Sequence, residues 1–278
     1  MPAAPTIREA LDAAQQATSR IEARVLLREV LQQNDAWLLA HDDELLTAEQ
    51  AQQYVALVVR RVAGEPIAYI TGRREFHGRE FLVNPAVLIP RPETELLVEL
   101  ALQRLPAAAP GRVLDLGTGS GCIGITIAAE RPQVQVTLVD ASAAALEIAR
   151  ANAAQWAPAN TTLLHSDWYS ALAAERYDLI VANPPYVAEG DAHLQQGDLR
   201  FEPRSALAAG VDGLNDLQRI IAEAPRHLRA GGWLLLEHGF DQAAACAWLL
   251  AAAGLQEVFH APDLAGMPRV SGGRNTGE

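Results

Sequence analysis

The 278-residue sequence contains no lysine, and all 22 of its cationic residues are arginine. This absence excludes a Schiff-base lysine and the lysine of a phosphate-binding P-loop. Because alanine is abundant, we interpret the arginine preference as coding bias. The 34 aspartates and glutamates outnumber the cations, which gives a net charge of −12 and a pI of about 5.0. Proteins that grip a nucleic-acid backbone usually carry a basic face, so this balance argues against a polynucleotide as the main ligand.

Cysteines and long apolar runs are also scarce. The two cysteines, Cys122 and Cys246, are far apart and fit no metal or disulfide spacing, and the 7 histidines form no i,i+4 metal-binding pair. No apolar run reaches about 18 residues, and the N-terminus lacks a basic region followed by an apolar one. We therefore expect a reduced, cytoplasmic protein with no metal site, no transmembrane helix and no signal peptide.

Residues 6–63 carry apolar side chains at helical spacing. Thr47 and Gln50 have the spacing of a capping box before one of these helices. Gly64-Glu65-Pro66 is expected to end the helical section. We predict a small helical bundle domain over residues 1–70.

The remaining chain has a different pattern. Residues 71–88 mix β-type residues with glycines and a proline, which predicts a β-hairpin-like linker. From residue 89 to 278, short apolar strands alternate with helical segments, as in a mostly parallel sheet covered by helices. The first of these segments, Ile89-Pro90-Arg91-Pro92-Glu93-Thr94-Glu95, is held extended by its prolines. Thr94 is predicted to cap the helix that begins near Glu95.

A glycine-rich turn, Gly117-Thr118-Gly119-Ser120-Gly121, lies between the predicted strands 113–116 and 134–139. Such a turn lets a ligand approach the backbone, and an acid at the end of the second strand, here Asp140, can hydrogen-bond both hydroxyls of a ribose. Cys122 stands where the dinucleotide fingerprint has its third glycine. The pattern resembles the first motif of Rossmann-like methyltransferases, which bind S-adenosylmethionine.

Two more strand ends carry side chains that suit a ligand. Asp167 and Trp168 follow the strand 161–165. A tryptophan there can stack on adenine and the carboxylate can accept from its exocyclic amine, although capping and packing also explain both residues. The segment 188–214 is long for a connection, and we expect it to shape the target pocket.

The strand 177–182 is followed by Asn183-Pro184-Pro185-Tyr186. Two consecutive prolines end the strand in an extended loop, and the residue before a proline is kept out of the helical region. The Asn183 side-chain oxygen and the Pro184 carbonyl can accept two N–H bonds from a planar amino group, and Tyr186 can lie against its plane. A turn that merely ends the strand is the alternative. After an apolar strand and a nucleotide-type turn, the motif predicts a site that holds an NH₂ group.

Together these motifs resemble one known family, the glutamine N5-methyltransferases that modify peptide chain release factors. The resemblance covers nearly the whole chain. Asn-Pro-Pro-Tyr is shared with adenine and cytosine-N4 DNA methyltransferases, whereas the Arg91–Glu95 loop and Gln195-Gln196-Gly197-Asp198 discriminate. Other matching segments are Gly64–Gly72, Arg74–Phe76, Leu88–Glu95, Asp115–Gly121, Ser166–Trp168, Arg200–Pro203 and Leu235–Gly239.

The resemblance implies an α/β fold: a Rossmann-like class I methyltransferase domain with a mostly parallel seven-stranded sheet, preceded by the helical bundle. It implies S-adenosyl-L-methionine as cofactor, S-adenosyl-L-homocysteine as product, and the glutamine of the Gly-Gly-Gln loop of class 1 release factors as substrate. It also implies a monomer whose N-terminal domain helps to dock the substrate, with no direct nucleic-acid or membrane partner. The implied cofactor-binding residues are Gly117, Thr118, Gly119, Ser120, Gly121, Asp140, Asp167, Trp168 and Asn183; the implied catalytic residues are Asn183, Pro184 and Tyr186; the implied substrate-binding residues are Asn183, Pro184, Pro185 and Tyr186.

Two alternatives remain open at the level of sequence. A DNA or RNA amino-methyltransferase would use the same four residues, but it needs a basic target-recognition region and room for a flipped base. The first 90 residues carry more acidic than basic side chains, which makes a poor basic arm. A non-catalytic cofactor-binding scaffold would have no need of an intact NH₂-holding motif at Asn183.

Overall fold

The computed structural model describes residues 4–157 and 159–277. The chain divides into two compact units, Met1–Gly72 and Arg73–Glu278, each with its own hydrophobic core. Within the described residues, no helix is long and apolar enough to cross a membrane.

The N-terminal unit is helical, as its apolar spacing predicted. The hydroxyl of Thr47 accepts from the backbone N–H of Gln50 at 3.1 Å, and the Gln50 side chain accepts from the Thr47 N–H at 2.9 Å, so the predicted capping box is confirmed. Gly64-Glu65-Pro66 does not end the helical section, because a further short helix follows it. Pro66 is the N-cap of that helix, a position that needs no N–H donor. The helices are α1 (Ile7–Ala14), α2 (Arg20–Leu31), α3 (Asp35–Ala40), α4 (Ala48–Val62) and α5 (Ile67–Thr71).

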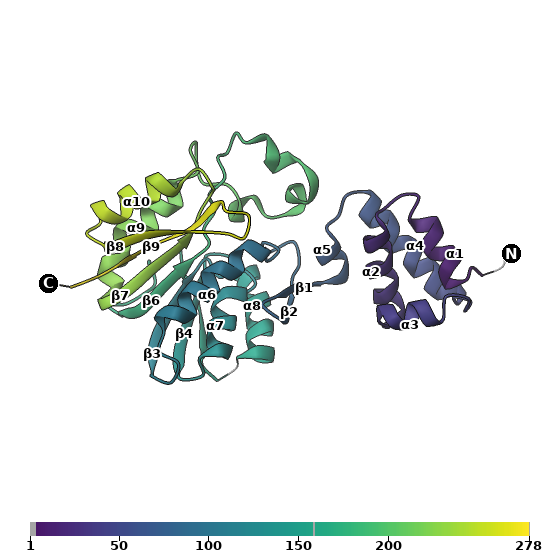
Figure 1. The fold of residues 1–278 in the computed structure, drawn as a ribbon, viewed down its shortest axis with the longest axis horizontal. Coiled ribbons are helices and arrows are strands. Elements are labelled where there is room, and N and C mark those ends of the chain that lie inside the picture. Colours follow the sequence, from purple (N-terminus) through teal and green to yellow (C-terminus); the bar gives the residue numbers. More distant parts are fainter. Residues whose placement is uncertain (1–3, 158, 278) are drawn as a thin grey trace. The chain divides into compact units, whose positions relative to one another are not determined.

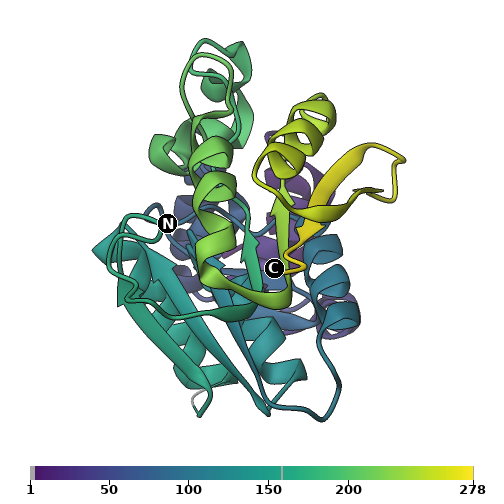
Figure 2. The same cartoon turned by 90° about the vertical axis from the view of Figure 1, so that its left-hand side faces the viewer.

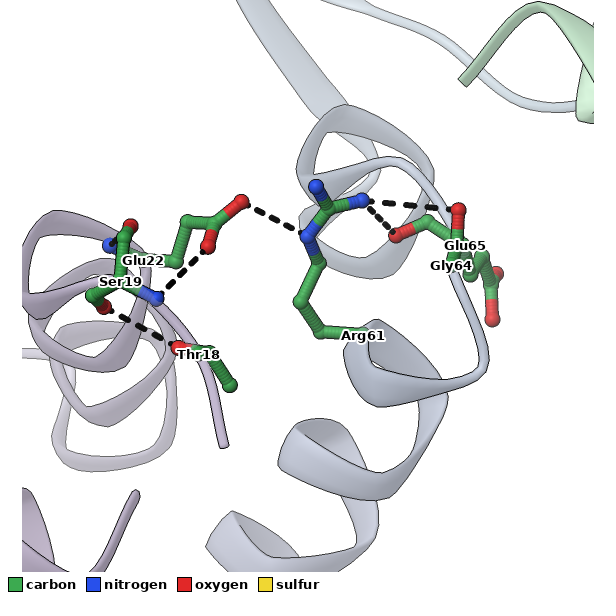
Figure 3. A network of polar contacts seen from close by, with 6 residues as sticks. All are labelled: Thr18, Ser19, Glu22, Arg61, Gly64 and Glu65. Carbon is green, nitrogen blue, oxygen red and sulfur yellow. Dashed lines mark hydrogen bonds and ion pairs between the residues drawn. The ribbon is translucent and has the colours of Figure 1, made fainter. Parts of the chain in front are cut away.

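One polar network ties the ends of two of these helices together (Figure 3). Glu22 accepts from the Ser19 backbone N–H at 3.0 Å, which completes the capping box at the start of α2. Its other carboxylate oxygen accepts from the Arg61 guanidinium at 2.7 Å, and Arg61 also donates to the Glu65 carbonyl at 3.0 Å. The arginine thereby joins α2, α4 and the turn before α5.

The larger unit is built on a seven-stranded sheet within the described residues, in the order β5-β4-β3-β6-β7-β9-β8. Only β9 runs antiparallel to its neighbours β7 and β8, so the predicted mostly parallel sheet is confirmed. The strands are β3 (Gly111–Leu116), β4 (Val134–Asp140), β5 (Thr161–His165), β6 (Tyr177–Ala182), β7 (Leu228–Glu237), β8 (Gln256–Pro262) and β9 (Pro268–Arg274).

Helices cover both faces of this sheet (Figure 1). Neighbouring strand residues point to opposite faces, so Val113 and Val181 pack with α6, α7 and α8, whereas Leu114 and Ile180 pack with α9 and α10. The helices α9 and α10 lie side by side (Figure 2). These helices are α6 (Glu95–Arg104), α7 (Cys122–Glu130), α8 (Ala143–Trp156), α9 (Asn215–His227) and α10 (Ala243–Ala252).

A β-hairpin lies within residues 71–88, formed by β1 (Arg73–Phe76) and β2 (Arg79–Leu82). It is bonded to α8: the Leu82 N–H donates to the Asn152 side chain at 2.8 Å, and the Asn152 amide donates back to the Leu82 carbonyl at 3.0 Å. The long connection 188–214 contains three short 3₁₀ helices: η2 (Ala192–Gln195), η3 (Gly197–Phe201) and η4 (Arg204–Ala206). Elsewhere in the chain, the 3₁₀ helix η1 (Pro92–Thr94) directly precedes α6.

The carboxyl ends of the parallel strands meet at one edge of the sheet. Leu116 pairs with both Val139 and Ala182, and Ala182 also pairs with Leu236. From β3 the chain continues outward to β4 and β5, whereas β6 and β7 lie on its other side. This reversal of strand order is where open α/β sheets bind their ligands.

Candidate active site

The glycine-rich turn after β3 is folded around the buried carboxylate of Asp115. Its Oδ2 atom accepts from the Thr118 hydroxyl at 2.6 Å and from the Gly124 backbone N–H at 3.0 Å. Burial raises the pKa of Asp115 to about 6. The Oδ1 atom has no hydrogen-bond partner among the described residues. The carboxylate therefore shapes the turn from inside the domain.

Asp140, the predicted ribose-binding acid, ends β4 beside this turn. Its Oδ2 atom accepts from the Gly119 backbone N–H at 2.8 Å, and its Oδ1 atom accepts from the Ser142 backbone N–H at 2.8 Å. Burial raises the pKa of Asp140, and the two backbone hydrogen bonds offset part of that effect. A carboxylate oxygen has more than one lone pair, so each oxygen can still accept from a ligand hydroxyl.

The ring of Trp168 lies against Gly117. A Cβ atom at Gly117, where φ is +68°, would lie 3.1 Å from a ring carbon of Trp168. Trp168 itself has a left-handed backbone, with φ of 48°, and its indole N–H donates to Asp216 at 3.2 Å. Because glycine has no side chain, the Trp168 ring can pack directly against the turn at Gly117.

Asp167 is more exposed than its neighbours. Its carboxylate forms an ion pair with Arg219, with a nitrogen to oxygen distance of 2.8 Å. Both side chains are more than half exposed, at 59% for Asp167 and 52% for Arg219. A ligand amine would therefore share this carboxylate with an arginine and with water.

A cavity of about 390 Å³ opens at the carboxyl edge of the sheet, within the range of about 300–1,000 Å³ that is typical of ligand pockets. Most of the predicted site residues line it: Gly117, Thr118, Gly119, Ser120, Asp140, Asp167, Trp168, Asn183 and Pro185. Among the residues that the structure describes, Gly121, Pro184 and Tyr186 are predicted site residues that do not line it. The turn, Asp140 and Asn183 thus meet around one space.

Asn183 is held by a residue 89 positions earlier in the chain. Its side-chain nitrogen donates to the hydroxyl of Thr94 at 3.3 Å, which leaves the side-chain oxygen as the end available to a ligand. Thr94 stands before α6, but its side chain makes no capping hydrogen bond there. The predicted capping role of Thr94 is wrong, because its own backbone is already helical and its hydroxyl is turned to Asn183.

Glu237 is a buried acid at the end of β7 that contacts Tyr186. The Tyr186 hydroxyl donates to its Oε1 atom at 3.2 Å. Burial raises the pKa of Glu237 to about 7, whereas hydrogen bonding from Thr94, the charge of Arg269 and the Tyr186 hydroxyl act in the opposite direction. Burial also raises the pKa of Tyr186, so its hydroxyl keeps its proton.

The segment 188–214 reaches the site through Glu202. Its buried carboxylate accepts from the Ile89 backbone N–H at 3.0 Å and pairs with the Arg91 guanidinium. Three residues that follow Glu202 line the cavity: Pro203, Ser205 and Ala206. Part of the segment therefore forms a wall of the pocket, as expected.

Sequence reasoning missed the supporting residues around the cavity. Glu237 could have been found by the same argument as Asp140, since it is an acid at the end of an apolar strand. Asp216 and Arg219 lie in α9 and carry no local signal of their contacts with Trp168 and Asp167.

The strand order and the position of the cavity at the switch point are those of a Rossmann-like methyltransferase. Two family models agree with this class: a methyltransferase small domain matches residues 93–200, and a PrmC N-terminal domain matches residues 6–72. A 16S rRNA N2 G1207 methyltransferase of T. thermophilus, in complex with AdoMet and guanosine, shares the fold, with a TM-score of 0.54 and 22% identity over 73% of this chain and 49% of that chain.

Curated relatives narrow the class to a family. A release factor glutamine methyltransferase of Bordetella pertussis is 54% identical over 91% of this chain and 94% of its own length. Another, of Xylella fastidiosa, is 52% identical over 96% of this chain and 97% of its own length. The chain belongs to the release factor glutamine methyltransferase family.

Proposed function

We propose that this protein transfers a methyl group from S-adenosyl-L-methionine to the side-chain amide nitrogen (N5) of the glutamine in the Gly-Gly-Gln loop of class 1 release factors. The observation that carries this proposal is that Asn183 lines the cavity at the switch point while its side-chain nitrogen is bonded to Thr94, so that its side-chain oxygen can accept from a ligand. The names of the close relatives support the same substrate and favour it over a DNA or RNA base.

The described residues fit the proposed cofactor. The turn from Gly117 to Gly121 offers a close backbone approach, Asp140 has acceptor capacity for both ribose hydroxyls, and Trp168 offers an aromatic face at the cavity wall. Asp167 would accept from the exocyclic amine of the adenine. When bound, the cofactor supplies an electrophilic methyl group on a positively charged sulfur.

The chain's own task is to orient a poor nucleophile. The lone pair of a primary amide is delocalised, and rotation about a peptide C–N bond costs about 18–20 kcal/mol, which sets the scale of that delocalisation. The Asn183 side-chain oxygen and the Pro184 carbonyl would accept the two amide hydrogens and stabilise the positive charge that grows on the nitrogen. Tyr186 and Pro185 would hold the amide plane for an in-line approach.

The remaining proposals concern partners. The helical N-terminal unit would help to dock the release factor, the enzyme would act as a monomer, and it would work in the cytoplasm, where release factors function. The S-adenosyl-L-homocysteine product would leave the same cavity.

A labelled-methyl assay tests the proposal. Purified enzyme and labelled S-adenosyl-L-methionine are incubated with a class 1 release factor, with the same factor carrying alanine in place of the loop glutamine, and with duplex DNA. Label on the unmodified factor alone is expected. Label on DNA would mean that the NH₂-holding motif binds a base instead.

A further inference from the structure

The loop that carries the proposed catalytic residues has few groups of its own that can hold it in place. Pro184 and Pro185 have no backbone N–H, so the loop must be fixed mainly through its carbonyls and side chains. At its start, Thr94 accepts from the Asn183 side chain. At its end, the carbonyl of Tyr186 is held by groups from two other parts of the chain.

Gln242, the N-cap residue of α10, is the first of these groups, and only 8% of it is exposed. Its Nε2 atom donates to the Tyr186 carbonyl at 3.0 Å and to the Gly213 carbonyl at 3.3 Å, with a longer contact of 3.5 Å to the Asp212 carbonyl. Its Oε1 atom accepts from the Gly239 backbone N–H at 2.9 Å. If the amide turned over, its oxygen would face carbonyl oxygens, so its surroundings fix which end donates.

The backbone of Gly213 is the second group, and it lies directly against the same carbonyl. A Cβ atom at Gly213, where φ is +72°, would lie 2.2 Å from the Tyr186 carbonyl oxygen and 2.9 Å from the Gln242 Nε2 atom. A side chain at this position would therefore push the Tyr186 backbone away. Gln242 and Gly213 together form a seat for this carbonyl.

The seat acts together with contacts on either side of it. The Tyr186 hydroxyl donates to the Glu237 Oε1 atom at 3.2 Å. The next residue, Val187, donates its N–H to the Leu207 carbonyl at 2.9 Å and accepts from the Ala209 N–H at 3.0 Å. Because its backbone and the tip of its ring are both held, Tyr186 has little freedom to change the plane of the ring.

We propose that Gln242, together with Gly213, is a positioning residue that fixes the ring of Tyr186 for the methyl acceptor. Among the described residues, neither Gln242 nor Gly213 lines the cavity, so both act through Tyr186 rather than on the cofactor. The inference rests on the proposed function, because the plane of the ring affects turnover only if Tyr186 packs against the bound amide.

Kinetics of matched glutamine variants test the inference. Gln242→Glu keeps the shape of the side chain and the acceptor for Gly239, but its ionised form has no hydrogen to donate to Tyr186. We expect kcat to fall by about 10-fold to 100-fold, as a misplaced reacting group does, while the affinity for S-adenosyl-L-methionine stays unchanged in calorimetry. Gln218→Glu makes the same change at an exposed position of α9 and serves as the control. Wild-type kcat in Gln242→Glu, or equal losses of kcat and cofactor affinity, would overturn the inference.

A pair of glycine variants tests the seat without changing Gln242. Gly213→Ala and Gly254→Ala each add a methyl group at positive φ, +72° and +83°. Only at Gly213 would the methyl group meet the Tyr186 carbonyl, since nothing lies within 4 Å at Gly254, beyond the other end of α10. Gly213→Ala should therefore lower kcat as Gln242→Glu does, and Gly254→Ala should keep the wild-type value. Equal kcat in the two variants would contradict the inference.

A double-mutant cycle tests whether Gln242 acts through the ring. Tyr186→Ala removes the ring but keeps the carbonyl. In that background Gln242→Glu should lower kcat little further, because the group that it positions is already absent. Two losses that multiply in full would mean that Gln242 supports turnover by another route, and would overturn the inference.

An NMR measurement gives a readout that needs no methyl acceptor. The ring resonances of Tyr186, identified in tyrosine-labelled protein by their loss in Tyr186→Phe, should shift in Gln242→Glu and in Gly213→Ala. They should stay in place in Gln218→Glu and Gly254→Ala. Resonances that do not move in Gln242→Glu would contradict the inference even if release factors are methylated. If they move as expected but the wild type methylates no factor, the proposed function fails instead.

Discussion

The backbone N–H of Gly119 donates a hydrogen bond to the carboxylate of Asp140 over 2.8 Å. This bond joins the turn after β3 to the end of β4, so the two parts of the proposed cofactor site are one structural unit. The Ser142 N–H holds the other oxygen at 2.8 Å, which fixes the plane of the carboxylate before any ligand arrives. A preorganised acceptor of this kind reduces the ordering cost of binding.

Asp140→Ala is therefore expected to weaken the binding of S-adenosyl-L-methionine. Hydrogen bonds to charged groups contribute about 1.5–3 kcal/mol each, so the loss should be at least roughly 10-fold in the dissociation constant. Isothermal titration calorimetry measures it directly. Asp167→Asn should have a smaller effect, since Asp167 is exposed and paired with Arg219. Unchanged affinity in Asp140→Ala would refute the ribose-binding role.

Asn183→Ala should lower turnover rather than cofactor affinity, the reverse of what is expected for Asp140→Ala. Removal of one preorganised partner of developing charge costs roughly 2.7–4 kcal/mol of transition-state stabilisation, by analogy with an oxyanion-hole donor. We expect kcat to fall by two to three orders of magnitude at most, on that same scale, while cofactor affinity stays close to wild type. Parallel loss of turnover and of cofactor binding would argue that Asn183 supports the fold of the pocket instead.

Gly117→Ala and Gly119→Ala separate backbone strain from contact with Trp168. Both glycines have positive φ, +68° and +55°, so each substitution is strained by about 1–2 kcal/mol. Only at Gly117 would the new Cβ approach the Trp168 ring, at 3.1 Å, since nothing lies within 4 Å at Gly119. In urea unfolding, the free energy of unfolding should therefore be lower for Gly117→Ala than for Gly119→Ala, by about 1–3 kcal/mol. Equal losses would show that the ring does not rest on the turn in solution.

Asp115→Asn tests the buried acid beneath the turn through pH. The pKa of Asp115 is raised from 3.8 to about 6 in the folded state. An acid whose pKa is raised by folding contributes stability that is present below its unfolded pKa and is lost as pH rises through its folded pKa. The free energy of unfolding changes by on the order of 3 kcal/mol across this range. The free energy of unfolding of the wild type relative to Asp115→Asn should therefore fall between about pH 4 and pH 6. A difference that is constant over this range would mean that Asp115 titrates normally.

The sequence predicted the parts of the site that depend on local chain geometry. Asp140 ends one apolar strand and Asn183 directly follows another. Because the carboxyl ends of parallel strands meet at one edge, their proximity followed from the alternation of strands and helices. The glycine-rich turn and the Asn-Pro-Pro-Tyr segment were recognisable for the same reason.

The supporting contacts were not predictable because they join distant segments. Thr94 has the sequence context of a helix cap, and only the folded chain brings its hydroxyl to the side chain of Asn183, which is 89 positions away. Glu202 meets the Ile89 backbone across 113 positions of sequence. The left-handed backbone of Trp168 is likewise imposed by its surroundings, since tryptophan has no local preference for that conformation.

The central claim is that the methyl group arrives on one amide nitrogen, and tandem mass spectrometry of a treated class 1 release factor tests it most directly. The account predicts a single added methyl group on the side chain of the glutamine in the Gly-Gly-Gln loop, absent when Asn183→Ala replaces the wild-type enzyme. A methyl group on any other residue, or an unmodified factor beside methylated nucleic acid, would contradict it.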